Sequence, residues 1–287
     1  MEMRPPPSGA ERDHWSTEAY SASASFVPLL TQKILVYIDP QPTDRVLDVG
    51  CGDGKFTAKY ADRVGYVLGL DASEGMIEAA RRNSGRPETV EYKVVDCRYL
   101  GTEVREGSVE GAKWDKVVSN AALHWILRDP TTRISMLRAI HDCLKPGGSF
   151  IFEMGGHGNV PEVHSAILAA LVHRGVPIDA AREASPWFFP SDAWMRTTLE
   201  NIGFRIDKLE VEYRPTKLTT DERGGIEGWL RLMGAPFLEI LGDEEKRESA
   251  VKEVCEVLES VITREEDGSK WLGYVRLRGV AVKKAKC

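Results

Sequence analysis

The stretch that decides the fold is Val46–Gly54, with the sequence VLDVGCGDG. Its first residues form a short apolar strand pattern, and its glycines lead directly toward a helix. Glycine lets a ligand approach the backbone because it has no Cβ and readily adopts a positive φ. The N–H groups that open the following helix favour a polar or anionic group. The stretch therefore predicts a nucleotide-like cofactor, with a plain strand-to-helix turn as the alternative.

The glycine spacing differs from that of two common nucleotide-binding turns. A dinucleotide fingerprint has the pattern G-x-G-x-x-G, but Lys55 stands where the third glycine belongs. A phosphate-binding loop requires Gly-Lys-Ser/Thr, which does not follow here. The acidic Asp48 at the head of the turn would repel a pyrophosphate. It suits a cationic ligand that carries an amino acid.

Further strand patterns downstream end in polar residues. The next one ends at Asp71, about twenty residues after the glycines, where a parallel α/β unit places an acid that holds two ribose hydroxyls. Two later ones end at Asp96-Cys97 and at Asn120. Because open parallel sheets bind ligands at the carboxyl ends of their strands, we expect these residues to line one crevice.

With these motifs the chain resembles the class I S-adenosylmethionine-dependent methyltransferases. The resemblance covers about residues 45–155 and rests on five motifs in order: 46–54, Gly69–Met76, Val95–Cys97, Trp114–Asn120 and Leu144–Gly148. It implies an α/β fold, a Rossmann-like doubly wound sheet of seven mostly parallel strands with helical lid insertions. It also implies S-adenosyl-L-methionine as cofactor and S-adenosyl-L-homocysteine as product.

A narrower resemblance concerns the methyl acceptor. Asn120–Trp125 resembles the segment after the fourth strand in the trans-aconitate methyltransferase-like family, and Trp15–Tyr20 and Gly268–Leu277 are similar to that family's leading segment and last strand. This implies O-methylation of a small carboxylic acid. Two alternatives stay open: O-, N- or C-methylation of a natural product, and a cofactor-scaffolded cyclase or binding module that transfers no methyl group.

The resemblance also implies roles for individual residues. Asp71 is expected to bind the ribose diol, Asp96 the adenine amino group, and Asp48 to orient the amino-acid end of the cofactor. The full cofactor-binding set is Asp48, Gly50, Cys51, Gly52, Asp71, Ala72, Met76, Asp96, Cys97, Asn120 and Ala121.

The acceptor side of the predicted site is less explicit. His124 and Tyr20 are the candidate catalytic residues, although a carboxylate acceptor is already ionised and needs no base, unlike a phenol, alcohol or carbon acid. The candidate substrate-binding residues are Trp15, His157 and Arg276. Arg214, Arg231 and Arg276 are candidate clamps for an acidic substrate, because a guanidinium binds a carboxylate bidentately. Arg276 is preferred because it matches the last strand of the family that the chain resembles. The aromatic cluster at 187–189 is interpreted as lid core.

Composition limits the class of protein. The chain has 287 residues, a formal net charge of −6 and 42% hydrophobic residues, which indicates a globular protein and argues against nucleic acid or an anionic membrane as partner. Five scattered cysteines without C-x-x-C spacing indicate no metal site and a reducing, cytoplasmic location. We expect a small-molecule acceptor as partner, and a monomer or homodimer.

The expected organisation alternates core and lid segments. It comprises a disordered tail (1–12), an N-terminal helix with the cofactor-binding core (13–155), a lid segment (156–190), a core helix and strand (191–218), a helical lid insertion (219–267) and a final core strand (268–287).

Overall fold

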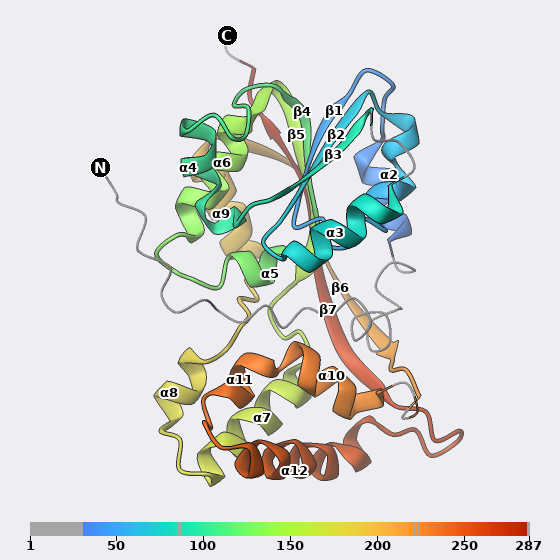
Figure 1. The fold of residues 1–287 in the computed structure, drawn as a ribbon, viewed down its shortest axis with the longest axis vertical. Helices are drawn as coiled ribbons and strands as arrows, with labels where there is room; N and C mark the ends of the chain where they lie inside the picture. The colour runs from blue at the N-terminus through green and yellow to red at the C-terminus, as the bar shows by residue number, and fades with distance from the viewer. Residues whose placement is uncertain (1–30, 85–87, 221, 223, 286–287) are drawn as a thin grey trace.

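The computed structural model describes residues 31–84, 88–220, 222 and 224–285, and a single seven-stranded sheet forms its centre (Figure 1). The strand order is β3-β2-β1-β4-β5-β7-β6, with β7 antiparallel to both of its neighbours. This confirms the predicted fold class. The strands are β1 (Arg45–Val49), β2 (Tyr66–Asp71), β3 (Val90–Val94), β4 (Trp114–Asn120), β5 (Leu144–Gly155), β6 (Phe204–Lys217) and β7 (Trp271–Lys283).

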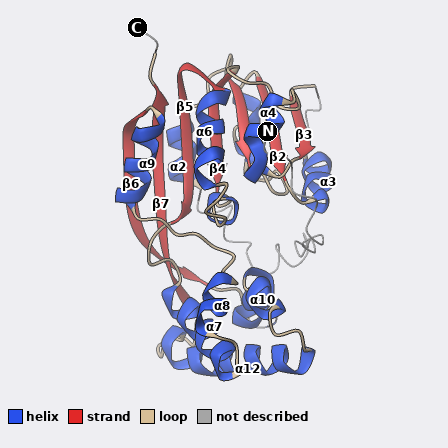
Figure 2. Ribbon diagram, turned by 90° about the vertical axis from the view of Figure 1, so that its left-hand side faces the viewer, coloured by secondary structure: helices blue, strands red, loops and turns tan. Residues whose placement is uncertain are grey.

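Helices cover both faces of the sheet (Figure 2). On one face lie α2 (Gln32–Ile38) and α3 (Glu74–Asn83). On the other lie α4 (Leu100–Arg105), α6 (Arg133–Cys143) and α9 (Asp192–Ile202). The predicted N-terminal helix is thus described from Gln32 onward, and its earlier part lies outside the described residues.

The alternation of side chains along β1 explains why this strand is buried on both faces. Leu47 and Val49 belong to the core on the α6 face, whereas Val46 belongs to the core on the α2 face. Since side chains of a strand alternate between the two faces, Asp48 shares the α2 face with Val46. The side chain of Asp48 is therefore buried on the α2 face of the sheet.

A second, helical part lies below the sheet in Figure 1, and β6 and β7 extend into it. It contains α7 (Pro161–His173), α8 (Ile178–Glu183), α10 (Gly225–Met233), α11 (Ala235–Glu239) and α12 (Glu244–Ile262). These helices share their own apolar core, to which the β7 residues Leu272 and Tyr274 contribute. A short helix, α5 (Leu123–Ile126), follows β4 between the two parts.

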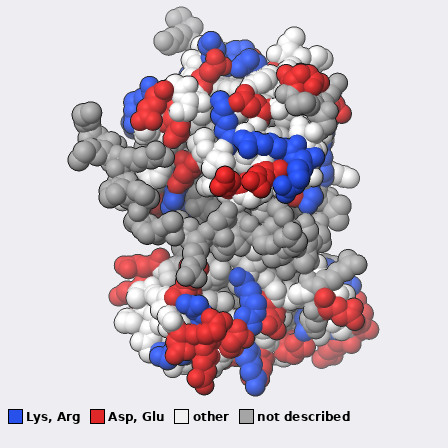
Figure 3. All heavy atoms as spheres, viewed as in Figure 1, with Lys and Arg blue, Asp and Glu red and all other residues white. Residues whose placement is uncertain are grey.

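Ion pairs connect the helices of this second part. Arg174, just after α7, contacts Glu253 of α12 at 2.7 Å, and Arg231 of α10 contacts Glu248 of α12 at 2.7 Å. Figure 3 shows acidic side chains gathered over this part, where α12 begins with Glu244 and Glu245. The Arg231–Glu248 pair is exposed, and exposed pairs contribute little to stability, so the shared apolar core mainly holds the helices together. Among the described helices, none is long and apolar enough to cross a membrane.

Candidate active site

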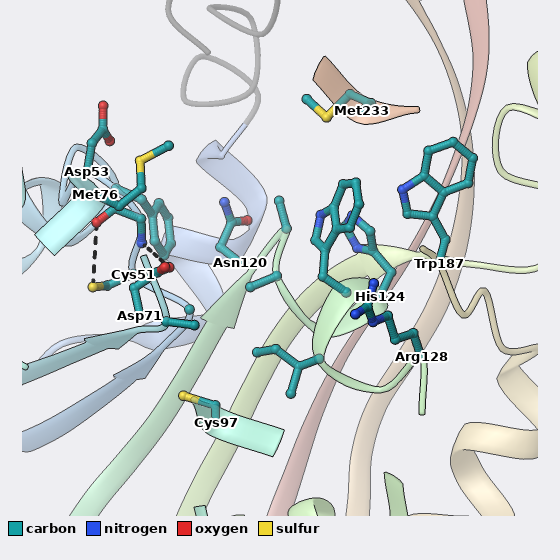
Figure 4. Close-up of a pocket in the computed structure, with 18 of the residues that line it drawn as sticks. Cys51, Asp53, Asp71, Met76, Cys97, Asn120, His124, Arg128, Trp187 and Met233 are labelled. Carbon is teal, nitrogen blue, oxygen red and sulfur yellow. Dashed lines mark hydrogen bonds between the residues drawn. The ribbon is translucent and has the colours of Figure 1, made fainter. Parts of the chain in front are cut away.

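One pocket runs along the carboxyl ends of β1, β2 and β4 and continues to the helical part. Figure 4 shows Asn120 in its middle, with Cys51 and Asp71 on one side and His124, Trp187 and Met233 on the other. The predicted cofactor residues that line it are Gly50, Cys51, Gly52, Asp71, Ala72, Met76, Asp96, Cys97, Asn120 and Ala121. The remaining member of that set, Asp48, is not among the lining residues.

The glycine turn leaves room for a ligand at Gly52. Both Gly50 and Gly52 have positive φ, at 75° and 55°. A Cβ at Gly50 would collide with the side chain of Ala122, so this glycine allows close packing of the chain. A Cβ at Gly52 would meet nothing within 4 Å, and Gly52 lines the pocket. Gly52 therefore lets a ligand come directly against the backbone.

Asp71 ties the end of β2 to the glycine turn. Its Oδ2 accepts the Gly52 N–H at 3.0 Å, and its Oδ1 accepts the Ser73 N–H at 3.0 Å. An ionised carboxylate has about four acceptor positions, and Asp71 lines the pocket, so its oxygens can also face a ligand hydroxyl. The geometry suits a ribose diol at this end of the pocket.

Asp96 follows β3 and is held by its own neighbour. Arg98 donates from Nη2 and Nε to Asp96 Oδ2 at 2.7 and 2.9 Å, and both residues line the pocket. Cys51 and Cys97 also line it, and burial raises the pKa of both thiols well above their usual range. These cysteines are therefore small packing groups at the site and not nucleophiles.

Asn120, at the end of β4, has a side-chain oxygen that accepts no hydrogen bond from the described residues. This oxygen, Oδ1, is buried. The next residue, Ala121, has a φ of 57°, a left-handed conformation that is strained for a residue other than glycine. Together with the open space at Gly52 and the Asp71 carboxylate, the orphaned Asn120 oxygen fits a cofactor that brings hydroxyl and amino donors.

Asp48 lies beneath this turn, where the alternation of β1 directs it. It is 1% exposed, and its Oδ2 accepts hydrogen bonds from the hydroxyls of Thr57 and Tyr60, both at 2.7 Å. Its Oδ1 is buried without a partner among the described residues. Burial raises the pKa of Asp48 to about 6, although the two hydroxyls act in the opposite direction. Asp48 is thus buried close to the glycine turn and does not itself line the pocket.

This raised pKa predicts a pH-dependent contribution to stability. Because the folded pKa of about 6 exceeds the unfolded value of 3.8, the folded state binds more protons between these values. We expect the Asp48 contribution to fall by about 3 kcal/mol as the pH rises from about 4 to above 6. Chemical unfolding of wild type and Asp48→Asn across this range measures it. The difference between the two proteins isolates Asp48, because His124 titrates alike in both, and a pH-independent difference would contradict the prediction.

The helical side of the pocket is lined by aromatic residues from distant segments. Trp125 comes from α5, Trp187 and Phe189 from the loop before α9, Trp229 and Met233 from α10, and Tyr274 from β7. The interpretation of 187–189 as lid core holds for Trp187 and Phe189, which pack in the apolar core of the helical part and also line the pocket. Phe188 instead packs on Trp194 against the core of the sheet. Among the lining residues that the sequence analysis did not name, Tyr274 was predictable, because it lies two residues before Arg276 and therefore on the same face of its strand.

Arg276 lies at the acceptor end of the pocket with its terminal nitrogens unused. It is 5% exposed, and its Nε donates to Glu153 Oε1 at 3.2 Å. Within the described chain, Nη1 and Nη2 have no hydrogen-bond acceptor, and the residue lines the pocket. Glu153 also accepts from Arg278 Nε at 2.6 Å and Arg214 Nη2 at 3.3 Å, and these guanidiniums lower its pKa despite its burial. The site is therefore prepared for an anion at Arg276.

His124 lines the pocket as a neutral ring. Burial lowers its pKa well below the usual range, and the charge of Arg276 lowers it further. The Gly155 N–H donates to His124 Nδ1 at 3.3 Å. Nδ1 is thus unprotonated, and the neutral ring carries its hydrogen on Nε2.

One of the remaining predicted residues is not part of the observed pocket, and two are not described. His157 is exposed and is not among the lining residues. Trp15 and Tyr20 lie outside the described residues.

The fold and the site define a Rossmann-like enzyme that holds a nucleoside cofactor at the carboxyl ends of its strands. A model of a methyltransferase domain matches residues 46–148. The chain is 34% identical over 272 residues to an uncharacterized methyltransferase of Schizosaccharomyces pombe, a match covering 94% of this chain and 98% of that relative. The chain therefore belongs to the S-adenosylmethionine-dependent methyltransferase family, as its sequence motifs predicted, and S-adenosylmethionine is its cofactor.

Two further relatives have names that include an acceptor. The chain is 30% identical to malonyl-[acyl-carrier protein] O-methyltransferase of Geobacter sulfurreducens, a match covering 70% of this chain and 73% of that relative. It is 25% identical to trans-aconitate 2-methyltransferase of an Azoarcus species, covering 80% and 84%. A solved methyltransferase structure from Methanosarcina mazei shares the fold, with a TM-score of 0.54 at 17% identity, covering 88% of this chain and 98% of that one.

Proposed function

We propose that this methyltransferase O-methylates a small carboxylic acid and that Arg276 binds the acid. The observation that carries the proposal is the buried guanidinium whose Nη1 and Nη2 have no acceptor among the described residues. Arg276 pairs with Glu153 through Nε, and a carboxylate is the natural bidentate partner of a guanidinium whose other nitrogens face a pocket. The names of the malonyl and trans-aconitate enzymes support an acid acceptor for this chain.

The charges around Glu153 support an anionic acceptor as well. The connected cluster contains four cationic side chains, Lys33, Arg214, Arg276 and Arg278, and three carboxylates, Glu153, Glu210 and Glu212. Three guanidiniums thus surround Glu153, and a carboxylate bound at Arg276 would lie beside them.

The state of His124 supports an acceptor that needs no deprotonation. A general base must offer an unprotonated nitrogen to the acceptor. Nδ1 is the unprotonated nitrogen, and it is occupied by the Gly155 N–H, whereas Nε2 carries the hydrogen. His124 can donate a hydrogen bond in the pocket but is not arranged to remove a proton. This favours a carboxylate over a phenol or alcohol.

The residues of the site would then act mainly by position. When bound, the cofactor supplies a sulfonium methyl group, which passes to the carboxylate oxygen as the carbon–sulfur bond breaks and its electron pair stays on sulfur. Asp71 would hold the ribose, Asp96 the adenine amino group, and the Asn120 oxygen the amino-acid end. Arg276 would align the acceptor. Orientation of this kind supplies on the order of 7–11 kcal/mol, provided that water is excluded.

We also propose that segments 156–190 and 219–267 act as the lid over this site. They carry α7, α8 and α10–α12, and they contribute Trp187, Trp229 and Met233 to the pocket lining. The aromatic side chains would exclude water from the reacting groups.

Label transfer tests the proposed function directly. The protein is incubated with methyl-labelled S-adenosylmethionine and a set of carboxylic acids, and the products are extracted as methyl esters. We expect label in a base-labile ester of at least one acid. Transfer to phenols or amines but to no carboxylate would refute the proposal.

Replacing His124 by glutamine separates carboxylate from phenol chemistry. Because a carboxylate needs no base, we expect kcat to fall by less than about tenfold, well short of the 10²–10⁴-fold typical of a lost general base. Steady-state kinetics with an accepted acid from pH 6 to 9 measures it, and wild type is expected to lack an ascending limb from His124. A loss of more than about a hundredfold would indicate a base and a different acceptor.

A further inference from the structure

The acceptor end of the pocket combines one cationic group with an apolar wall. The rings of this wall contact one another: Trp187 lies 5.9 Å from Trp125, 5.9 Å from Trp229 and 5.7 Å from Phe189 between ring centroids. We call Trp125, Trp187, Phe189, Trp229 and Met233 the apolar wall; all of them line the pocket. The wall unites three chain segments into one continuous surface.

Among the indole nitrogens of this wall, that of Trp229 is engaged within the protein. Trp229 donates its indole N–H to the Tyr274 hydroxyl at 2.8 Å, and burial raises the pKa of Tyr274 to about 12, so its hydroxyl stays neutral. The wall therefore offers ring faces and a thioether to an acceptor. Such a surface favours flat or flexible apolar groups.

The cationic side chains along the pocket are few and mostly engaged. Lys55 pairs with Asp53 at 2.5 Å, and Arg98 pairs with Asp96 at 2.7 Å, both at the cofactor end. Among the described lining residues, Arg128 and Arg276 are the other two permanent cations. An acid with three carboxylates would place at least one of them against the apolar wall, where an unpaired charge is costly.

We infer that the acceptor is an acid with fewer than three carboxylates, one of them at Arg276, and an apolar body, aromatic or alkyl, that lies against the apolar wall. The inference rests on the proposed carboxyl methylation. It narrows the class of acceptor and excludes a tricarboxylate such as trans-aconitate. The acid end is recognised by charge, and the body by ring and thioether contacts. Discrimination between acids then comes from the wall.

A matched set of acids tests the inference. Ester formation by wild type is compared for trans-cinnamate and decanoate, with one carboxylate each, and for trans-aconitate and citrate, with three each. We expect kcat/KM for the better monocarboxylate to exceed that for either tricarboxylate by at least about tenfold. Equal or better use of a tricarboxylate would overturn the inference and leave carboxyl methylation intact. Absence of ester from every acid, with S-adenosylhomocysteine still bound, would instead overturn the proposed function.

A substitution in the wall gives a second, independent measurement. Met233→Lys places a cation on the wall, and Met233→Leu is the matched apolar control. We expect Met233→Lys to reduce the ratio of monocarboxylate to tricarboxylate use by at least about tenfold and Met233→Leu to keep it within about threefold. S-adenosylhomocysteine affinity, measured by calorimetry, confirms that both variants are folded. An unchanged ratio in a folded Met233→Lys variant would show that the wall does not contact the acceptor.

Discussion

Replacing Arg276 by methionine is expected to lower kcat/KM for a carboxylic acid acceptor by about 30-fold to several thousand-fold. The range corresponds to about 2–5 kcal/mol for the loss of one partner from a buried, hydrogen-bonded charge pair. The loss should appear mainly in KM, because the guanidinium holds the acceptor equally before and during methyl transfer. S-adenosylhomocysteine affinity should stay unchanged, since Arg276 lies at the acceptor end of the pocket.

The fold is expected to tolerate this substitution. Glu153 keeps its contacts with Arg278 at 2.6 Å and Arg214 at 3.3 Å, so no buried carboxylate is left without a cation. Arg276→Lys is the matched control: it keeps the charge, loses the planar fork and should give an intermediate loss. If Arg276→Met retains wild-type kcat/KM for every accepted acid, Arg276 does not bind the acceptor.

Replacing Asp71 by alanine is expected to weaken cofactor binding by about 1–3 kcal/mol, or about 5- to 150-fold in Kd. The variant loses the acceptor for the ribose hydroxyls. It also leaves the Gly52 and Ser73 N–H groups, now held at 3.0 Å by the two carboxylate oxygens, without their partner. The glycine turn would then be less firmly positioned for the ligand. Calorimetric titration with S-adenosylhomocysteine measures the change.

Two control variants show whether a loss of affinity is specific to the Asp71 carboxylate. Asp71→Asn keeps one oxygen for the backbone donors, so we expect a smaller loss than in Asp71→Ala. Asp179→Ala removes an exposed acid from α8, far along the chain from the glycine turn, and should leave the affinity unchanged. A Kd for Asp71→Ala equal to that of Asp179→Ala would remove Asp71 from the cofactor site.

The cofactor half of the pocket was predictable because its determinants are local. Positive φ at Gly50 and Gly52, an acid directly after β2 and an amide at the end of β4 are each readable from a few consecutive residues. Parallel strands then bring these ends to one edge of the sheet. Asp48 shows what the motif leaves open, because its position at the head of the turn predicts a role in orienting the cofactor but not its buried hydrogen bonds with Thr57 and Tyr60.

The sequence by itself determined the fold class, the family and the identity of the cofactor, because these depend on short motifs at the ends of strands, each readable from a few consecutive residues. At the acceptor end the sequence indicated His124 and Arg276, and the tertiary structure decided the rest. The residues of this end come from α5, the loop before α9, α10 and β7, which are distant in sequence and meet only when β7 inserts beside β5 and the helical part packs on the sheet. The tautomer of His124 and the unused nitrogens of Arg276 likewise depend on contacts with Gly155 and Glu153. Such long-range contacts leave no periodic or local pattern in the sequence.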